Sequence, residues 1–136
     1  MKSIILLLLL SIVLLSDDNY ELKLYQSLLP ALFQKKSLIV YTQESEQKDI
    51  LKNSLILELS SSCSNSDLII GKSFDELSTE CLNKPIFATS YRSYINAQNS
   101  FGAFYWSKGR PQIQFKLEVI KTYNLHLPQN LYKYAK

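Results

Sequence analysis

The side chains with the most reactive chemistry are few: two cysteines, Cys63 and Cys81, and a single histidine, His126. Two thiolates and one distant imidazole do not supply the four ligands of a structural zinc site, so we expect no metal and no other cofactor. His126 lies between two leucines without a nucleophile near it in the sequence, which predicts a surface or packed residue. The carboxylates between residues 67 and 80 are explained by helix capping and solvent exposure. We therefore expect no enzymatic activity.

Three polar residues, Thr89, Ser90 and Arg92, follow an apolar run that is typical of a buried strand. The carboxyl ends of parallel strands are the usual place for a ligand crevice in α/β sheets. This placement favours a site for an anion or another small molecule.

Aromatic residues are concentrated in the stretch Phe101-Gly102-Ala103-Phe104-Tyr105-Trp106. Strand alternation places Phe104 and Trp106 on one side and Tyr105 on the other. The core needs only one of these sides, and aromatic residues near an arginine are favoured in interfaces. We therefore predict that Phe104, Tyr105, Trp106 and Arg110 bind a partner protein.

The elements that must position these residues follow from the hydrophobic pattern. A helix over residues 20–29 would carry Leu22, Tyr25, Leu28 and Leu29 on one face and Glu21 on the other, and Pro30 would end or kink it. A short helix is expected within 42–53, and the capping box Ser73-Phe74-Asp75-Glu76 predicts a helix to about Glu80. Strands are predicted at 38–41, 55–59, 67–71 and 86–89. Residues 90–100 are polar, and the C-terminus predicts two short helices that are broken at Pro128.

Residues 102–106 and 112–117 are strand-like and are separated by Ser107-Lys108-Gly109-Arg110-Pro111, which is typical of a hairpin. Strands alternating with helices indicate an α/β fold with a mostly parallel, flavodoxin- or Rossmann-like sheet flanked by helices. The hairpin would add a C-terminal antiparallel pair at the sheet edge. Residues 17–136 are expected to form a single domain.

The first sixteen residues have the pattern of a secretory signal peptide, with Lys2 before an apolar stretch from Ile4 to Leu15. That stretch is shorter than the roughly 20 residues that a membrane-spanning helix needs. Ser16 suits the last position before a cleavage site, whereas Leu14 departs from the small-residue pattern, so an uncleaved anchor remains an alternative. We expect an exported, periplasmic protein that is not inserted in the membrane after cleavage.

An oxidising compartment favours a disulfide between Cys63 and Cys81. The strand at 67–71 runs out and the predicted helix runs back, which would bring both cysteines to one end of the sheet. The loop closed by this bond predicts about 3 kcal/mol of stabilisation. A structural staple is favoured over a redox switch, and both remain open.

Composition and charge exclude other classes of protein. With 46% hydrophobic and 20% charged residues, the chain has the balance of a globular domain. The net charge of +3 is small and the basic residues are scattered, so we expect no nucleic acid partner.

Four stretches together resemble the YfiR-like family of small periplasmic regulators: residues 20–23; Cys63 ahead of 67–73; residues 85–90; and the region from Gly102 through Gly109, Arg110 and Leu117 to Ala135. The resemblance implies a non-enzymatic protein that docks on the periplasmic sensor part of an inner-membrane diguanylate cyclase of the GGDEF type. It further implies that this protein holds the cyclase inactive and that the state of the disulfide adjusts the strength of this binding.

The first hypothesis is therefore a periplasmic regulator of a membrane-bound signalling protein, with a second copy of the chain as a further expected partner. The alternative is a small periplasmic solute-binding protein in which the turn at Thr89 to Arg92 forms the entrance to the ligand site. An exported enzyme is the third and least favoured class.

Overall fold

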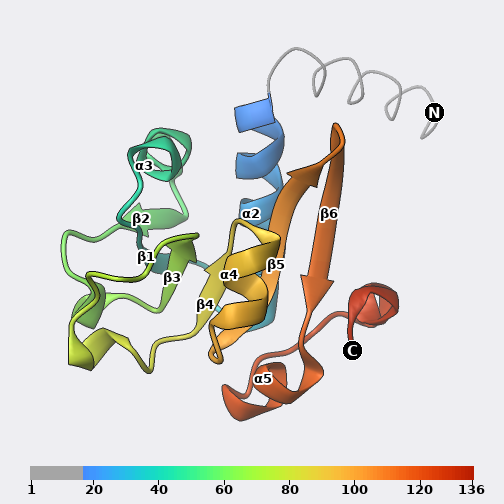
Figure 1. Cartoon of the computed structure of the whole chain (residues 1–136). Coiled ribbons are helices and arrows are strands. Elements are labelled where there is room, and N and C mark those ends of the chain that lie inside the picture. The colour runs from blue at the N-terminus through green and yellow to red at the C-terminus, as the bar shows by residue number, and fades with distance from the viewer. Residues whose placement is uncertain (1–16) are drawn as a thin grey trace.

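The computed structural model describes residues 17–136, and the predicted signal peptide, residues 1–16, lies outside the described residues. Six strands form one sheet: β1 (Leu38–Tyr41), β2 (Leu57–Leu59), β3 (Leu68–Gly71), β4 (Ile86–Ala88), β5 (Ser100–Ser107) and β6 (Arg110–Phe115). The helices are α2 (Asp17–Phe33), α3 (Ser45–Leu51), α4 (Tyr91–Asn96) and α5 (Leu117–Thr122), with 3₁₀ turns η1 (Cys63–Asn65), η2 (Thr79–Cys81) and η3 (Gln129–Tyr134). Figure 1 shows their arrangement.

The strand order is β2-β1-β3-β4-β5-β6, and every neighbouring pair is parallel except the antiparallel pair of β5 and β6. This confirms the predicted α/β class, its mostly parallel sheet and its C-terminal hairpin at the edge. The order of the parallel strands is that of flavodoxin-like sheets, in which the direction of winding reverses between β1 and β3. Ligands of such sheets bind outside the carboxyl ends of the strands near this reversal.

The two faces of the sheet are covered by different elements (Figure 1). Leu68 and Ile70 of β3 point into the larger core, which contains buried residues of α2, α3 and α5. Ile69 points to the other face, where it packs with Cys81 and Ile86. Tyr94 of α4 also lies on this second face. The continuous apolar pattern of β3 therefore reflects burial on both sides.

Pro30 was expected to end or kink the helix; α2 continues past it to Phe33, so the proline does not end the helix. Leu32 is fully buried and the ring of Phe33 lies 5.7 Å from that of Phe101, so packing holds the last turn in place. The N–H of Lys35 then donates to the carbonyl of Pro30 at 3.1 Å, with Gln34 in the left-handed region (φ 54°). This is the Schellman geometry of a helix end, built here without glycine.

The helix predicted from the capping box at residues 73–80 does not form. The segment makes turns instead, with the N–H of Leu77 donating to the carbonyl of Phe74, and only η2 is helical. Phe74 and Leu77 both pack against the cluster around Cys81. These contacts outweigh the local preference of the sequence, which is a weak determinant of structure by itself.

Helix α4 lies in the polar stretch 90–100, for which no element was predicted. The Ser90 side chain caps it by accepting a hydrogen bond from the N–H of Ser93 at 3.1 Å. Tyr94 is buried in the second face. Serine at the cap followed by apolar residues at helical spacing is a pattern that could have predicted this helix.

The hairpin between β5 and β6 is closed by Lys108 (φ 53°) and Gly109 (φ 76°). Two consecutive residues with positive φ form a type I′ turn, whose twist matches that of the two strands. Within β5, a Cβ at Gly102 would lie 2.9 Å from the ring of Phe115, so glycine leaves room for this buried aromatic residue.

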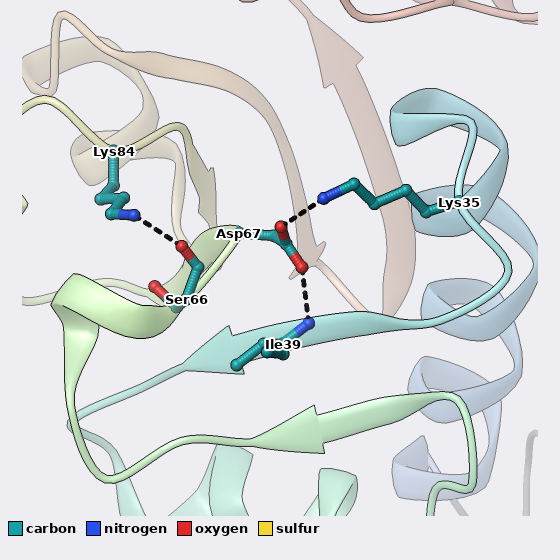
Figure 2. Close-up of polar contacts among 5 residues, drawn as sticks. All are labelled: Lys35, Ile39, Ser66, Asp67 and Lys84. Carbon is teal, nitrogen blue, oxygen red and sulfur yellow. Dashed lines mark hydrogen bonds and ion pairs between the residues drawn. The ribbon is translucent and has the colours of Figure 1, made fainter.

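At the amino ends of the strands, Asp67 joins two neighbouring strands to α2 (Figure 2). Its carboxylate accepts hydrogen bonds from Lys35 Nζ at 2.7 Å and from the N–H of Ile39 at 2.8 Å. Nearby, Lys84 Nζ donates to the carbonyl of Ser66 at 2.7 Å. These contacts tie together the segments in which β1, β3 and β4 begin.

Candidate functional site

A crevice of about 370 Å³ lies between the segment after β3 and helix α4. Its lining includes Lys72 and Ser73 from the end of β3, and Ser90, Arg92 and Asn96 from the region after β4. Two of the three predicted crevice residues, Ser90 and Arg92, therefore line one cavity. The lining also includes Ile86 at the start of β4, so the crevice extends along this face of the sheet, and binding of a ligand there stays a prediction.

The two cations of the crevice are not neutralised by the protein's own ion pairs. Within residues 17–136, the ion pairs are Lys35 with Asp67 and Lys52 with Asp49, so neither Lys72 nor Arg92 takes part in one. Both side chains are exposed, and Asp75 is the one carboxylate of the lining. The Ser90 hydroxyl is engaged in the cap of α4, with Ser93 Oγ at 2.8 Å. Lys72 was not foreseen because it comes from a different strand.

Glu44 occupies the reversal point between β1 and β3. Its carboxylate accepts hydrogen bonds from the N–H groups of Lys72 at 2.6 Å and Ser73 at 3.4 Å. A Cβ at residue 71 would collide with this carboxylate where it now lies, so glycine at the end of β3 leaves room for Glu44 to reach these N–H groups. Backbone donors that could bind an anion at this point are thus taken by a side chain of the same chain.

Thr89, the third predicted crevice residue, lines a second and smaller cavity of about 110 Å³. Its hydroxyl oxygen is buried and has no hydrogen-bond partner in the described part of the chain. The structure therefore separates Thr89 from Ser90, because side chains in an extended segment point alternately to opposite faces, and from Arg92, which lies on α4.

Glu21 lies beside Thr89 in this second cavity and is 8% exposed. Its expected position on the outer face of α2 is wrong. Its carboxylate accepts hydrogen bonds from the hydroxyl of Tyr25 at 3.1 Å and from Trp106 Nε1 at 3.3 Å, with Gln47 Nε2 at 3.4 Å. Burial raises the pKa of Glu21, against these hydrogen bonds, which lower it. The spacing of four residues between Glu21 and the buried Tyr25 could have indicated this position.

The predicted partner-binding residues do not form one surface. Phe104 is 3% exposed and belongs to the core, where its ring lies 5.8 Å from that of Tyr20. Trp106 is half-buried by its contact with Glu21, and Tyr105 faces the opposite side of the sheet, beside Tyr91 of α4. Arg110 is exposed at the tip of the hairpin. Core packing accounts for the burial of Phe104, so it does not offer a contact surface in this fold.

The predicted disulfide is confirmed: Cys63 and Cys81 are bonded, with their Cα atoms 5.8 Å apart. The bond joins η1 to η2, so the turns at 74–81, rather than the predicted helix, bring Cys81 back to Cys63. Cys81 is fully buried, and the Ser78 hydroxyl donates to its sulfur at 3.2 Å. A disulfide fits folding in an oxidising, exported compartment.

Comparison with family models, curated proteins and solved structures gives no match. The resemblance to YfiR-like regulators therefore stays a prediction from the sequence. Within residues 17–136, no helix is long and apolar enough to cross a membrane, and no group of three or more His, Cys, Asp or Glu residues could hold a metal ion. His126 is exposed, and its backbone N–H donates to the carbonyl of Leu32 at 2.8 Å.

Proposed function

We propose that this protein is an exported, periplasmic binding protein for a small solute that carries a phosphate or carboxylate group. The observation that carries the proposal is the crevice beside α4, whose lining includes Lys72 and Arg92, and neither of these cations forms an ion pair among the described residues. A guanidinium group can donate two parallel hydrogen bonds to one planar carboxylate or phosphate. Ser73 and Asn96 add neutral polar groups that can orient the rest of the ligand.

The apolar part of the crevice indicates the size and character of this ligand. Phe74 and Leu77 come from one wall, and Ile86 of β4 also lines it. A cavity of about 370 Å³ falls in the lower range of small-molecule sites, which usually combine apolar walls with a few polar groups. A compact anion with a short carbon skeleton suits this lining better than a large cofactor does.

Export is supported by the disulfide and by the apolar pattern of residues 4–15. Disulfides persist in secreted and periplasmic proteins and are rare in the cytosol. We infer that residues 1–16 act as a signal peptide and that residues 17–136 work in the periplasm.

A thermal-shift screen with phosphate, sulfate, short dicarboxylates and amino acids tests this function. A ligand at 100 times its dissociation constant stabilises the folded protein by about 2.7 kcal/mol. Arg92→Gln should abolish the shift, because it removes the bidentate donor. Arg110→Gln is the matched control, since Arg110 lies at the hairpin tip and does not line the crevice. The proposal fails if no anion stabilises the protein, or if both variants lose the shift equally.

The second candidate function is regulation of a membrane-bound signalling protein, and an apolar surface on α4 favours it. Tyr91 is 54% exposed and Ile95 is 52% exposed, one helical turn apart, and the ring of Tyr105 lies 6.0 Å from that of Tyr91. Exposed apolar residues that cluster in this way are common in protein interfaces. By the family resemblance, the partner would be the periplasmic sensor part of a diguanylate cyclase.

Cross-linking in intact cells tests this second function. A membrane protein with a GGDEF domain should be captured, and the double variant Tyr91→Ser, Ile95→Ser should reduce its capture. Tyr132→Ser removes an equally exposed tyrosine in η3 and should have no effect. Failure to capture such a protein under both oxidising and reducing conditions argues against the regulator.

A further inference from the structure

The crevice beside α4 is charged toward one end and apolar toward the other. Gly71 of β3 pairs with Ala88 of β4, the last residue of that strand. Lys72 follows Gly71 directly and Arg92 lies in the first turn of α4, so both cations lie toward the carboxyl ends of the strands. Ile86 lies two residues before Ala88, roughly 7 Å back along β4. A ligand that follows this face therefore meets charged residues first and apolar residues further along.

Asp75 adds a negative charge to a lining whose other charged residues are cations. It comes three residues after Lys72 in the same segment, it is exposed, and within residues 17–136 it takes part in no ion pair. Asp75 repels a ligand that carries only negative charge. A ligand with one anionic and one cationic group can pair with both kinds of side chain. The charges of the lining therefore favour a zwitterion.

Leu82 gives the crevice an exposed apolar surface at its other end. The residue is 51% exposed although it lines the crevice. Asn99 Nδ2 donates to the backbone carbonyl of Leu82 at 2.8 Å, which ties this part of the chain to the start of β5. Leu77 and Ile86 line the crevice as well. Covering such a surface with an apolar group is favourable because it removes that surface from water.

We propose that the ligand of this crevice is an α-amino acid with an apolar side chain of medium size. This inference rests on the proposed function and narrows its class of ligand. The α-carboxylate accepts hydrogen bonds from Arg92 and Lys72, and the α-ammonium group pairs with the Asp75 carboxylate. The side chain covers Leu82 and Ile86. An inorganic anion or a dicarboxylate leaves both Asp75 and the apolar end without a partner.

A calorimetric titration with leucine and two analogues of the same carbon skeleton tests the ligand class. The analogue 4-methylpentanoate lacks the ammonium group, and 3-methylbutylamine lacks the carboxylate. We expect leucine to bind about fivefold more tightly than 4-methylpentanoate, because the analogue loses one charged contact at an exposed residue. The amine should show no saturable binding.

The outcomes separate this inference from the proposed function. Equal affinity for leucine and 4-methylpentanoate overturns the amino acid as ligand and leaves the anion crevice standing. Absence of leucine binding overturns it as well, and titration with phosphate and short dicarboxylates then decides the proposed function separately.

The variant Asp75→Asn tests the ammonium contact. Its preference for leucine over 4-methylpentanoate should fall from about fivefold to about one, and its affinity for 4-methylpentanoate should not weaken. Glu76→Gln is the matched control, because Glu76 is the next exposed carboxylate and does not line the crevice. This control should keep the preference. A preference retained in Asp75→Asn, or lost equally in Glu76→Gln, contradicts the contact.

The variant Leu82→Ser tests the place of the ligand's side chain. It should weaken leucine binding about threefold and leave the affinity for glycine unchanged, since glycine has no side chain to cover residue 82. Leu55→Ser is the control, because Leu55 is 98% exposed and lies outside the lining of this crevice. Unchanged leucine binding in Leu82→Ser, or equal weakening in Leu55→Ser, overturns this placement.

Discussion

At the scale of single residues, Glu21 is the least expected feature of this protein. It is a buried carboxylate held by three neutral donors, and Glu46 raises its pKa further by electrostatic repulsion. Tyr25, its closest partner, is completely buried, and its pKa is raised by the same burial and by the charge of Glu21. The pair therefore places an ionisable group inside the main core at some cost to the folded state.

The raised pKa of Glu21 predicts how stability depends on pH. Because the folded state binds this proton more tightly than the unfolded chain does, the group contributes stability below its ordinary pKa of 4.5, and this contribution is lost as the pH rises through the folded pKa. Glu21→Gln removes this dependence. Urea unfolding from about pH 4.5 to neutrality should show wild type losing stability relative to the variant. Parallel curves for the two proteins would show that Glu21 is not perturbed.

The polar residues that follow β4 could be picked out from the sequence, because Thr89, Ser90 and Arg92 come directly after an apolar strand pattern and so lie at its carboxyl end. Lys72, Glu44 and Glu21 were not, since they come from other strands and a helix that only the fold brings together. Phe104 and Trp106 were placed on one side of their strand correctly, but the sequence did not tell which side faces the core.

At the scale of elements, tertiary contacts decide where local patterns conflict. Pro30 does not end α2, because Leu32 and Phe33 pack in the core. The capping box at Ser73 does not start a helix, since Phe74 and Leu77 pack beside the disulfide. Where packing agrees with the local pattern, as in β1 and β3, the predicted and observed boundaries agree closely.

The end of α2 gives a stability prediction at this scale. Gln34 adopts a left-handed conformation that costs a residue with a Cβ atom roughly 1 kcal/mol. Gln34→Gly should therefore stabilise the protein by about 0.5–1 kcal/mol. Asn124 has the same φ of 54° and is the matched control, because asparagine tolerates this region better and Asn124→Gly should gain less. Urea unfolding measures both variants. Equal gains of stability in the two, or a loss of stability in Gln34→Gly, would contradict backbone strain at Gln34.

At the scale of the whole molecule, the alternation of strands and helices was sufficient to predict a mostly parallel sheet with an antiparallel edge. The position of the ligand crevice depends on the winding order and on which loops meet, and neither is encoded in any short stretch of sequence. The disulfide was predicted from the compartment and from a strand that runs out and a helix that runs back, although the returning segment is a set of turns rather than a helix.

The disulfide gives the prediction for global stability. Cys63 and Cys81 are 18 residues apart, so the bond restricts a loop of moderate length in the unfolded chain. The double variant Cys63→Ala, Cys81→Ala should lose about 3 kcal/mol of unfolding free energy and keep the fold. Mass spectrometry without reductant should first show the bond in protein from the cell envelope. Two free thiols in that sample would remove the support for an oxidising compartment.

The central claim is that a small anion binds between the end of β3 and helix α4, and mapping amide resonances during a titration tests it most directly. With phosphate or the best anion of the screen, the account predicts saturable shifts confined to residues 72–75 and 90–96, with the hairpin tip at 108–110 unchanged. Shifts spread evenly over the basic surface, or none at residues 72–75 and 90–96, would contradict it.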